Sequence, residues 1–559
     1  MRLISAKKFT KDGKIRFKEF YRNNIPSYAI LSHTWEDGEE VTFDDCKSPV
    51  AKDKKGYKKI QNTCKLAMGD GIEYVWIDTC CIDKSSSAEL TEAINSMYHW
   101  YQQANVCYAY LSDLQGGNLK DCRWFTRGWT LQELIAPKTV QFFDRSWKNA
   151  GDKMSLLKQL STVTNIDAGI LSHKVPLSSA CVAKRFSWAA KRKTTRDEDL
   201  AYCLLGIFNI NMPMLYGEGR KAFTRLQEEI IRTTNDLSIF AWTWRGSWDG
   251  RPYLSFLAEG PEDFTWCSNL ILRTDPLVNE YEMAITNKGI HMQGPHWVSE
   301  YKDGAIRYSL SLQCTNKDEQ HRPILIPMRK AGPNIFMRAA KSGRMDVSLG
   351  ITSSYPINSK SFTLLTRLPR EQLTSGSLVS IFRHVAVAVE FPSDVPRMGV
   401  HGIPQKHWDV EDSVFFSPDS AVRRWGCVRP SGMSGEMLVC FWHKSNNEWE
   451  FQGTILNSSE EGMDGLMQDL FIFAEALDYP AEVVEGVLRR HGVKLGQKSI
   501  LVWHEAGTAT VSAGEVMPMS DAELAQFMQK HRRPNGNYDL PVDGWEKLSK
   551  MNEVVSPRG

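Results

Sequence analysis

Apolar residues near the start of the chain fall into short runs separated by segments with helical spacing. Four runs rich in aliphatic, β-branched and aromatic residues each end in polar residues, as the buried strands of a parallel sheet do. They are residues 28–33, 74–78, 106–111 and 139–143. Because each run is followed by a helical segment or a polar loop, the pattern predicts a parallel sheet with short connections.

The segments between these runs predict the helices. Residues 56–71 place apolar side chains at i, i+3 and i+4, and a glycine follows the last of them. Ser86 and Glu89 have the spacing of a capping box, which predicts a helix over 87–103. The stretch 127–137 supplies a third helix. Strands alternating with helices predict an α/β fold, here a small doubly wound sheet with helices on both faces.

The pattern changes twice further along the chain. Residues 150–240 have helical spacing, clearest at 199–208 and 221–233. From about 250, short alternating segments broken by Gly, Pro and Asn predict a β-rich region. Its expected strands are 281–285, 306–312, 323–327, 384–390 and 437–442. The last section mixes helices at 480–490 and 521–531 with a strand at 499–503 and ends in a polar tail.

We therefore predict four parts. Residues 1–148 form the sheet domain, and residues 149–245 form a helical extension that packs on it and completes or blocks its crevice. Residues 246–455 form a β-rich domain, and residues 456–559 form a mixed α/β section. We expect this C-terminal region to be the sensing or regulatory part. The sequence has no repeats and no G-x-x-x-x-G-K phosphate loop.

Polar and aromatic residues gather where the expected strands end. Ser32, His33 and Trp35 follow the first strand, and Asp78 ends the second. Ligands of open α/β sheets bind outside the carboxyl ends of the strands. The segment 122–133 leaves the third strand on the same side and contributes further candidates. They are Arg123, Arg127, Trp129 and Glu133.

Composition narrows the classes of partner. The chain has 559 residues, of which 42% are hydrophobic and 24% charged, enough for two to four globular domains. A net charge of +2 does not favour nucleic acid, and the basic cluster within 185–196 is expected to be a solvated face. No signal peptide or membrane span is predicted. The 12 scattered cysteines lack C-x-x-C spacing, which suits a reducing, cytoplasmic location and gives no metal signature.

Several candidates have a structural explanation as well as a functional one. Glu133 is either a catalytic carboxylate or the partner of Arg123 or Arg127 in a structural ion pair. Trp129 is a pocket wall or core residue, or a stacking surface. Asp78 either accepts a hydrogen bond from substrate hydroxyls or caps a neighbouring loop.

Three other arrangements of chemically active residues are not favoured. Ser32 and His33 are adjacent on a strand and point to opposite faces, so we do not expect a Ser–His catalytic pair. The vicinal Cys80-Cys81 pair is expected to pack beneath a loop. Asp78, Asp83 and Asp113 do not have the spacing of a known Mg²⁺ motif, so no metal site is predicted.

Three segments resemble the HET (heterokaryon incompatibility) domain of filamentous fungi. They are Tyr28-Ala-Ile-Leu-Ser-His-Thr-Trp35, Trp76-Ile-Asp-Thr-Cys-Cys-Ile-Asp-Lys84 and Arg127-Gly-Trp-Thr-Leu-Gln-Glu-Leu-Ile-Ala-Pro137. The resemblance continues through 197–206 and 214–219 and covers roughly residues 1 to 245. The family is associated with programmed cell death when incompatible cells fuse, which implies a cell-death effector that acts with other cell-death proteins or as a homo-oligomer.

A more distant resemblance bears on fold and chemistry. Ile30-Leu-Ser-His33 is similar to the first strand of TIR domains, and Trp129-Thr-Leu-Gln-Glu-Leu134 to a TIR segment that ends in Glu-Leu. This resemblance implies a TIR-like, flavodoxin-like sheet in which Glu133 cleaves NAD⁺ between nicotinamide and ribose. Thr130 stands where TIR domains usually have Cys.

The implied reaction suits a single carboxylate. Cleavage of the N-glycosidic bond passes through an oxocarbenium-like state, and nicotinamide leaves as a neutral amine without needing a general acid. NAD⁺ is then a substrate, and no cofactor is needed. Trp35 or Trp129 would stack on a ring, Arg123 or Arg127 would bind phosphates, and Ser32, His33 and Asp78 would bind ribose or phosphate. The competing hypothesis is a non-enzymatic signalling module that binds a nucleotide or protein partner in the same crevice.

Overall fold

A computed structural model describes residues 1–243 except 22, 23 and 117. Beyond these it describes 253–273, 281–319 apart from 295 and 301–305, and scattered segments between 323 and 512. The helix expected at 521–531 and the polar tail lie outside the described residues.

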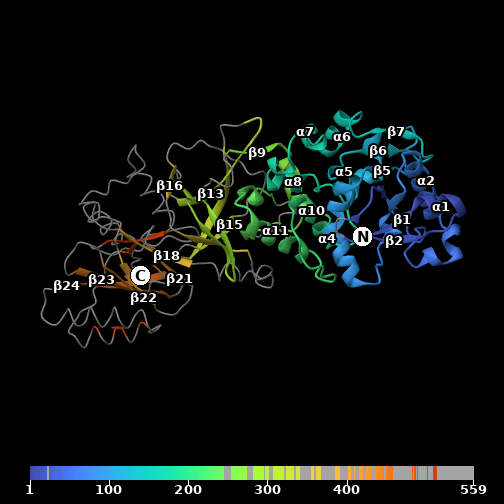
Figure 1. Ribbon diagram of the computed structural model, residues 1–559. Helices are drawn as coiled ribbons and strands as arrows, with labels where there is room; N and C mark the ends of the chain where they lie inside the picture. Colours follow the sequence, from blue (N-terminus) through green and yellow to red (C-terminus); the bar gives the residue numbers. More distant parts are fainter. Residues whose placement is uncertain are drawn as a thin grey trace, which may run out of the picture. The chain divides into compact units, whose positions relative to one another are not determined.

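The chain divides into two compact units. The first comprises Met1–Ser247, Leu257–Asn279 and Leu312–Ile324, and the second comprises Trp248–Phe256, Glu280–Ser311 and Leu325–Gly559. The first contains the N-terminal sheet and the helices, coloured blue to green in Figure 1, and the second contains most of the later strands.

The N-terminal sheet has four parallel strands at its centre. Its order is β2-β1-β4-β3-β5-β6-β7, in which β4, β3, β5 and β6 are parallel and the other three pair antiparallel. The central strands, in the order in which the chain forms them, therefore lie 2-1-3-4. The bounds are β1 Arg2–Ser5, β2 Phe17–Glu19, β3 Ala29–His33, β4 Tyr74–Trp76, β5 Val106–Tyr110, β6 Val140–Phe143 and β7 Asn149–Asp152.

The four central strands confirm the predicted parallel sheet, and the flanking strands were missed. β1, β2 and β7 are short and lack the apolar runs that marked the equally short β4 and β6. The second predicted strand is too long, because it ends at Trp76. Asp78 instead opens a one-turn helix, α3 (Asp78–Cys81).

Helices cover both faces of the sheet. On one face, α4 (Ser87–Gln103) packs its rings against the strands: Trp76 meets Tyr101 edge-on, and the Tyr101 hydroxyl donates to the Leu31 carbonyl at 3.0 Å. Short α5 (Thr130–Ile135) is fully buried beside it. On the other face lie α1 (Ala6–Asp12) and α2 (Lys55–Gly69), and the Tyr108 hydroxyl of β5 bonds Asp70 just after α2.

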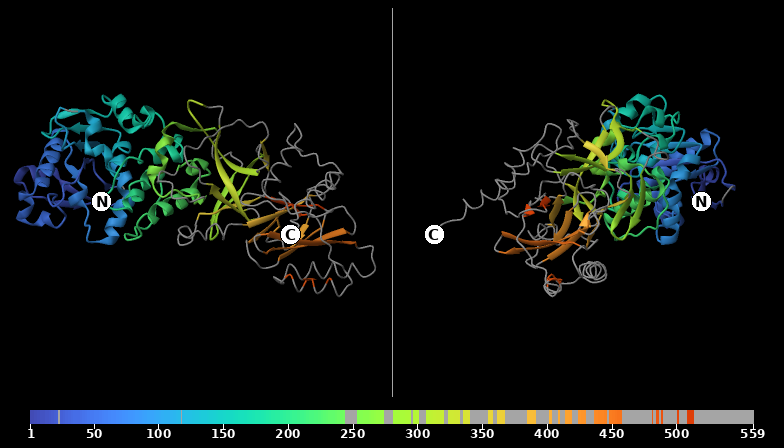
Figure 2. Two further views of the ribbon diagram at one scale, coloured as in Figure 1. Left: turned by 180° about the vertical axis from the view of Figure 1, so that it is seen from behind. Right: turned by 90° about the vertical axis from the view of Figure 1, so that its left-hand side faces the viewer.

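The helical region follows the sheet within the same unit. Its helices are α6 Leu157–Thr164, α7 Ala168–Leu171, α8 Val182–Ser187, α9 Asp199–Tyr202, α10 Leu205–Phe208 and α11 Lys221–Thr233. The two clearest sequence predictions, 199–208 and 221–233, correspond to α9 with α10 and to α11. α10 packs on α4 and α7 on α5, so this region is part of the support of the sheet (Figure 2).

Later strands confirm the β-rich region. A ten-stranded sheet is followed by sheets of five and four strands. The five predicted strands correspond to β10 Glu282–Thr286, β13 Ile306–Asn316, β14 Pro323–Gly332, β18 His384–Glu390 and β23 Glu436–Ser445. The expected strand at 499–503 is β25 Ile500–Leu501. Among the helices that the structure describes, none has the length and apolar character to span a membrane.

Gly206 sets how closely α10 approaches α4. A β-carbon at Gly206 would lie 2.0 Å from Cβ of Tyr98, a distance that packed atoms cannot tolerate. Overpacking of this kind costs about 1–3 kcal/mol or more, so Gly206→Ala is expected to lower the melting temperature by roughly 5 °C.

Gly69 provides the matched control. It is an exposed helical glycine of α2 whose added β-carbon would have no heavy atom within 4 Å. Gly69→Ala should leave the melting temperature unchanged or raise it by about 2 °C. Circular dichroism melting of the three proteins tests this contact, and equal melting of Gly206→Ala and wild type would contradict it.

Candidate active site

Ser32 and Glu133 meet where β3 ends. Ser32 Oγ hydrogen-bonds Glu133 Oε2 of α5, and the indole N–H of Trp124 donates to Ser32 Oγ at 2.8 Å. Because the hydroxyl accepts from Trp124, its own proton is directed to the Glu133 carboxyl. Ser32 is fully buried, Trp124 is fully buried and Glu133 is 5% exposed. The sequence-predicted carboxyl and the predicted serine are therefore direct partners.

Glu133 is held in an unusual electrostatic state. Burial, assisted by the negative charge of Asp78, raises the pKa of Glu133 to about 8, against the opposing effects of the Ser32 hydrogen bond and of Arg127 and Arg192. The carboxyl group is therefore largely protonated at neutral pH. A raised carboxyl pKa beside a second carboxylate is a common property of functional sites.

His33 points to the opposite face of the sheet, as adjacent strand residues must. Its Nε2 lies 3.1 Å from Asp78 Oδ1, and its Nδ1 lies 3.2 Å from the Lys59 amine of α2. An ammonium has only donors, so Nδ1 accepts from Lys59 and Nε2 donates to Asp78. Lys59 in turn bonds Glu40 Oε1 at 2.5 Å.

Asp78 joins this buried chain to the surface. Its Oδ2 accepts from Trp35 Nε1 at 2.9 Å. Burial tends to raise the pKa of Asp78, but hydrogen bonds from His33 and Trp35 and the nearby charges outweigh it, so the pKa is lowered. Asp78 is thus an anion that orients an aromatic ring.

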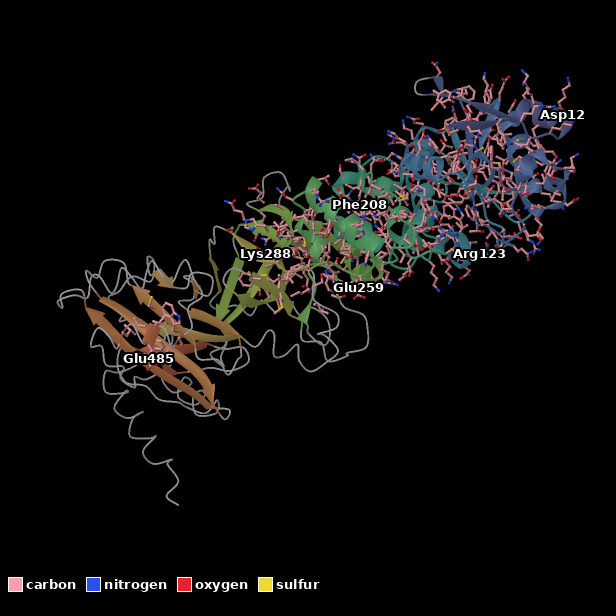
Figure 3. All side chains as sticks on the ribbon, turned by 90° about the horizontal axis from the view of Figure 1, so that it is seen from below. Asp12, Arg123, Phe208, Glu259, Lys288 and Glu485 are labelled. Atoms are coloured by element: carbon pink, nitrogen blue, oxygen red, sulfur yellow. The ribbon has the colours of Figure 1, made fainter. Side chains whose placement is uncertain are left out.

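Trp35 and Arg123 form the exposed part of the cluster. Trp35 is 43% exposed, and the Lys84 ammonium lies 3.5 Å from the centroid of its ring. The guanidinium of Arg123, labelled in Figure 3, donates to the Trp35 carbonyl at 3.0 Å. The Arg123 backbone N–H donates to Asp113 at 2.7 Å. An exposed ring bordered by two cations is suited to a planar, anionic ligand.

Arg127 and Trp129 are directed toward the helical region. Arg127 donates to Thr195 Oγ1 at 3.4 Å. Trp129 hydrogen-bonds the Asp199 carboxylate of α9, where burial raises the pKa of Asp199 and the hydrogen bonds of Tyr216 and Trp129 oppose that rise. The sequence left Trp129 as a pocket wall, a core residue or a stacking surface, and its indole is engaged by α9.

The structure thus brings most of the predicted residues together in two linked groups. Ser32 with Glu133 lies on the α5 side, and His33, Asp78 and Trp35 form a chain on the α2 side. Asp78 connects the two groups electrostatically. Among the described residues, neither Arg123 nor Arg127 forms a salt bridge with Glu133, so the structural ion pair considered from the sequence is not formed.

Sequence reasoning missed Trp124, Lys59 and Glu40. Trp124 sits in a segment that was singled out, but its aromatic side chain looks like ordinary core. Lys59 lies beside the apolar face of α2. The helical pattern rests on apolar residues such as Tyr57 and Ile60, so it does not mark a lysine as buried. In the residues that the structure covers, no group of three or more potential ligands is arranged to hold a metal ion.

Comparison with known proteins relates part of the chain to a family. Residues 28–120 match the family model of the heterokaryon incompatibility protein (HET). This segment is similar to a HET domain. The matched span contains Ser32, His33, Trp35 and Asp78, and Glu133 follows it.

Other comparisons extend this result. The vegetative incompatibility protein HET-E-1 of Podospora anserina is 48% identical over 233 residues, which cover 39% of this chain and 17% of that protein. The chain therefore matches less than a fifth of the length of this relative. Residues 221–260 match a domain of unknown function (DUF8212). No solved structure matches the chain significantly.

The raised pKa of Glu133 predicts a pH-dependent stability. The folded chain keeps a proton until about pH 8, whereas the unfolded chain releases it near the ordinary value of 4.5. The stability from this group is therefore complete below about pH 4.5 and declines as the pH rises toward 8. Glu133→Gln removes the decline, so its melting temperature relative to wild type should rise by on the order of 5 °C between pH 5 and pH 8.5.

Glu229→Gln is the control, because Glu229 is a partly exposed carboxylate of α11 paired with Arg232. Its difference from wild type should stay constant over the same range. Differential scanning fluorimetry measures both differences, and a constant gap for Glu133→Gln would contradict a buried, protonated carboxyl.

Proposed function

We propose that this protein is an effector of fungal incompatibility and cell death whose HET domain cleaves NAD⁺, or a related nucleotide, between nicotinamide and ribose. Glu133 is the catalytic carboxylate, and NAD⁺ is a substrate, not a cofactor. The observation that carries the proposal is the hydrogen bond between Ser32 and the buried Glu133 carboxyl at the end of β3. The match to the HET family model and a relative named as a vegetative incompatibility protein support the biological role.

The position of the carboxyl supports a ligand site. The order 2-1-3-4 of the parallel strands is that of flavodoxin-like sheets, as expected for a TIR-like domain, and their ligands bind where the strand order reverses. Here the reversal lies between β3 and β5. Glu133 stands at this point, because its side chain bonds Ser32 of β3 and its carbonyl accepts from the Cys107 thiol of β5 at 3.9 Å.

The electrostatics of Glu133 suit a cationic substrate. A buried carboxyl that resists ionisation gains most when a positive charge arrives, because little water screens the interaction. The nicotinamide ring of NAD⁺ is a cation, and the ribose becomes cationic as the glycosidic bond breaks. Glu133 would release its proton to water on binding and stabilise this developing charge, while Asp78 adds a second negative charge nearby. Nicotinamide would leave with the electron pair of the glycosidic bond, and water would add to the ribosyl cation and release a proton.

Trp35 and Arg123, the exposed part of the cluster, suit a ring and the phosphates of a dinucleotide. Trp35 offers a ring face held in orientation by Asp78. Arg123 is exposed beside it and has a guanidinium that suits phosphate oxygens. Arg127 is half-buried and engaged by Thr195, which makes it the weaker phosphate candidate of the two arginines.

The burial of Glu133 also favours a second candidate function. At 5% exposure the carboxyl does not meet a ligand without local opening. A non-enzymatic module that binds a nucleotide or a protein partner at Trp35 and Arg123 fits this burial directly. In the enzymatic proposal, the opening is the regulated step, controlled by the β-rich region or by assembly with another copy or another cell-death protein.

We place the activity in the cytoplasm. In the described part of the chain, every cysteine is a free thiol, as expected in a reducing compartment.

Nicotinamide release from NAD⁺ tests the reaction. Wild-type protein is expected to release nicotinamide, and Glu133→Gln to lose on the order of 10²-fold or more, because the glutamine keeps the shape but cannot carry the charge. Chromatography of released nicotinamide, with circular dichroism to verify folding, measures this. Glu229→Gln is expected to retain wild-type turnover.

Two results would redirect the assignment. Equal turnover by wild type and Glu133→Gln would remove Glu133 from the reaction. Absence of turnover at every protein concentration, together with NAD⁺ binding by calorimetry that Trp35→Ala abolishes, would favour the binding module over the enzyme.

A further inference from the structure

Arg192 is a buried cation without a carboxylate partner. It lies in the helical region after α8 and is 7% exposed. Its guanidinium donates to the carbonyls of Arg127 at 2.8 Å and Trp188 at 3.2 Å, and to Thr130 Oγ1 at 2.9 Å. In the part of the chain that the structure describes, it forms no salt bridge. Since burying a charge without a counter-ion is costly, its placement needs an explanation.

A chain of hydrogen bonds leads from Arg192 to Glu133. Thr130 Oγ1 accepts from Arg192 and lies 2.5 Å from the Trp124 carbonyl, to which it donates. The Trp124 indole donates to Ser32, and Ser32 bonds Glu133. Arg192 therefore anchors the turn that carries Trp124, whose indole orients the Ser32 hydroxyl toward the carboxyl.

The charge also acts on Glu133 through space. Thr130 and Glu133 are three residues apart on α5, so they occupy the same helix face about one turn apart. The guanidinium bonded to Thr130 is thus on the Glu133 side of the helix, within a buried region where little water screens it.

We infer that Arg192 is a positioning residue for Glu133, supplied by the helical region to make the buried carboxyl able to ionise. It acts through Glu133 and the Thr130–Trp124–Ser32 chain and touches no ligand. Without it, only Ser32 and Arg127 would oppose burial and Asp78, and the pKa of Glu133 would rise further. The helical region is then a part of the site, and a sheet domain ending at residue 148 would lack one of the two cations that favour the charged carboxylate.

The electrostatics of the two groups are reciprocal. The positive charges of Arg127 and Arg192 oppose the burial that raises the pKa of Glu133. Burial lowers the pKa of Arg192 to about 10, and the Cys203 and Glu133 side chains oppose that shift. Each group therefore favours the charged form of the other.

A double-mutant cycle on the full chain tests this inference without using catalysis. The variants are Glu133→Gln, Arg192→Gln and the double variant, melted at pH 6 and at pH 9.5. At pH 6 Glu133 is protonated, so Glu133→Gln should have the same effect in both backgrounds. At pH 9.5 Glu133→Gln should raise the melting temperature of Arg192→Gln by about 3 °C or more beyond what it does in the wild-type background. The reason is that Glu133→Gln then removes a carboxylate that has lost its cation.

Arg185 provides the matched control. It is a half-buried arginine that donates to the Ile207 carbonyl and lies over the Phe208 ring, and it is not among the groups that shift the pKa of Glu133. The same cycle with Arg185→Gln should show no difference between the two pH values. A coupling between Arg192 and Glu133 that is equal at pH 6 and pH 9.5 would reduce Arg192 to a structural role and overturn the inference.

Folding failure is itself informative. If Arg192→Gln folds at pH 6 but not at pH 9.5, rescue by Glu133→Gln supports the inference. If it is unfolded at both pH values with or without Glu133→Gln, the role of Arg192 is structural. Arg192→Lys keeps the charge. Its melting temperature should therefore change between pH 6 and pH 9.5 by the same amount as that of wild type, and a different change would overturn the inference.

An activity measurement adds a second readout that rests on the proposed function. The pH at which kcat/KM reaches half its maximum should rise by about one unit in Arg192→Gln and stay constant in Arg185→Gln. A structural defect would lower kcat/KM equally at every pH. If wild type shows no turnover, the proposed reaction fails, while the melting cycle still decides the role of Arg192.

Discussion

The Ser32–Glu133 hydrogen bond is the interaction on which the candidate site depends. It joins the first parallel strand to the helix that follows the third, so two distant motifs meet at one atom pair. A carboxyl buried here would be destabilising if it were charged and unpartnered. Burial keeps the carboxyl largely neutral, and the Ser32 hydroxyl, oriented by an indole donor, opposes that effect by favouring the charged form.

Side chains alternate along β3, so its adjacent residues Ser32 and His33 point to opposite faces of the sheet. Ser32 faces α5 and the helical region, and His33 faces α2. Asp78, which opens α3 after the neighbouring strand, bonds His33 and acts on Glu133 through its negative charge. The site is therefore assembled from both helical layers, and the sheet between them keeps the two carboxyl groups at a fixed separation.

Local patterns predicted the parts of the fold that they encode directly. The Ser86–Glu89 capping signal gave the start of α4, and the periodicity of 87–103 gave its end, because both are written in consecutive residues. β1 and β2 were missed because they are short and lack the apolar runs that marked β4 and β6. The Ser32–Glu133 proximity followed from topology, but Trp129 did not join it, since its indole is bound by Asp199, seventy positions later. Lys59 and Arg192 could not be found from sequence, because a buried cation differs from a surface one only in its tertiary partners.

The His33 relay has a consequence for substitutions distant from Trp35. The proton on Nε2 is assigned by an amine on α2, which is held by Glu40, and Nε2 then donates to Asp78, the residue that bonds the Trp35 indole. Lys59 and Glu40 therefore support the orientation of a surface aromatic that neither of them contacts. Strand β3, the loop after it, helix α2 and Asp78 at the start of α3 act together, and a graft of the Trp35 loop onto another protein would need all four to keep the ring in place.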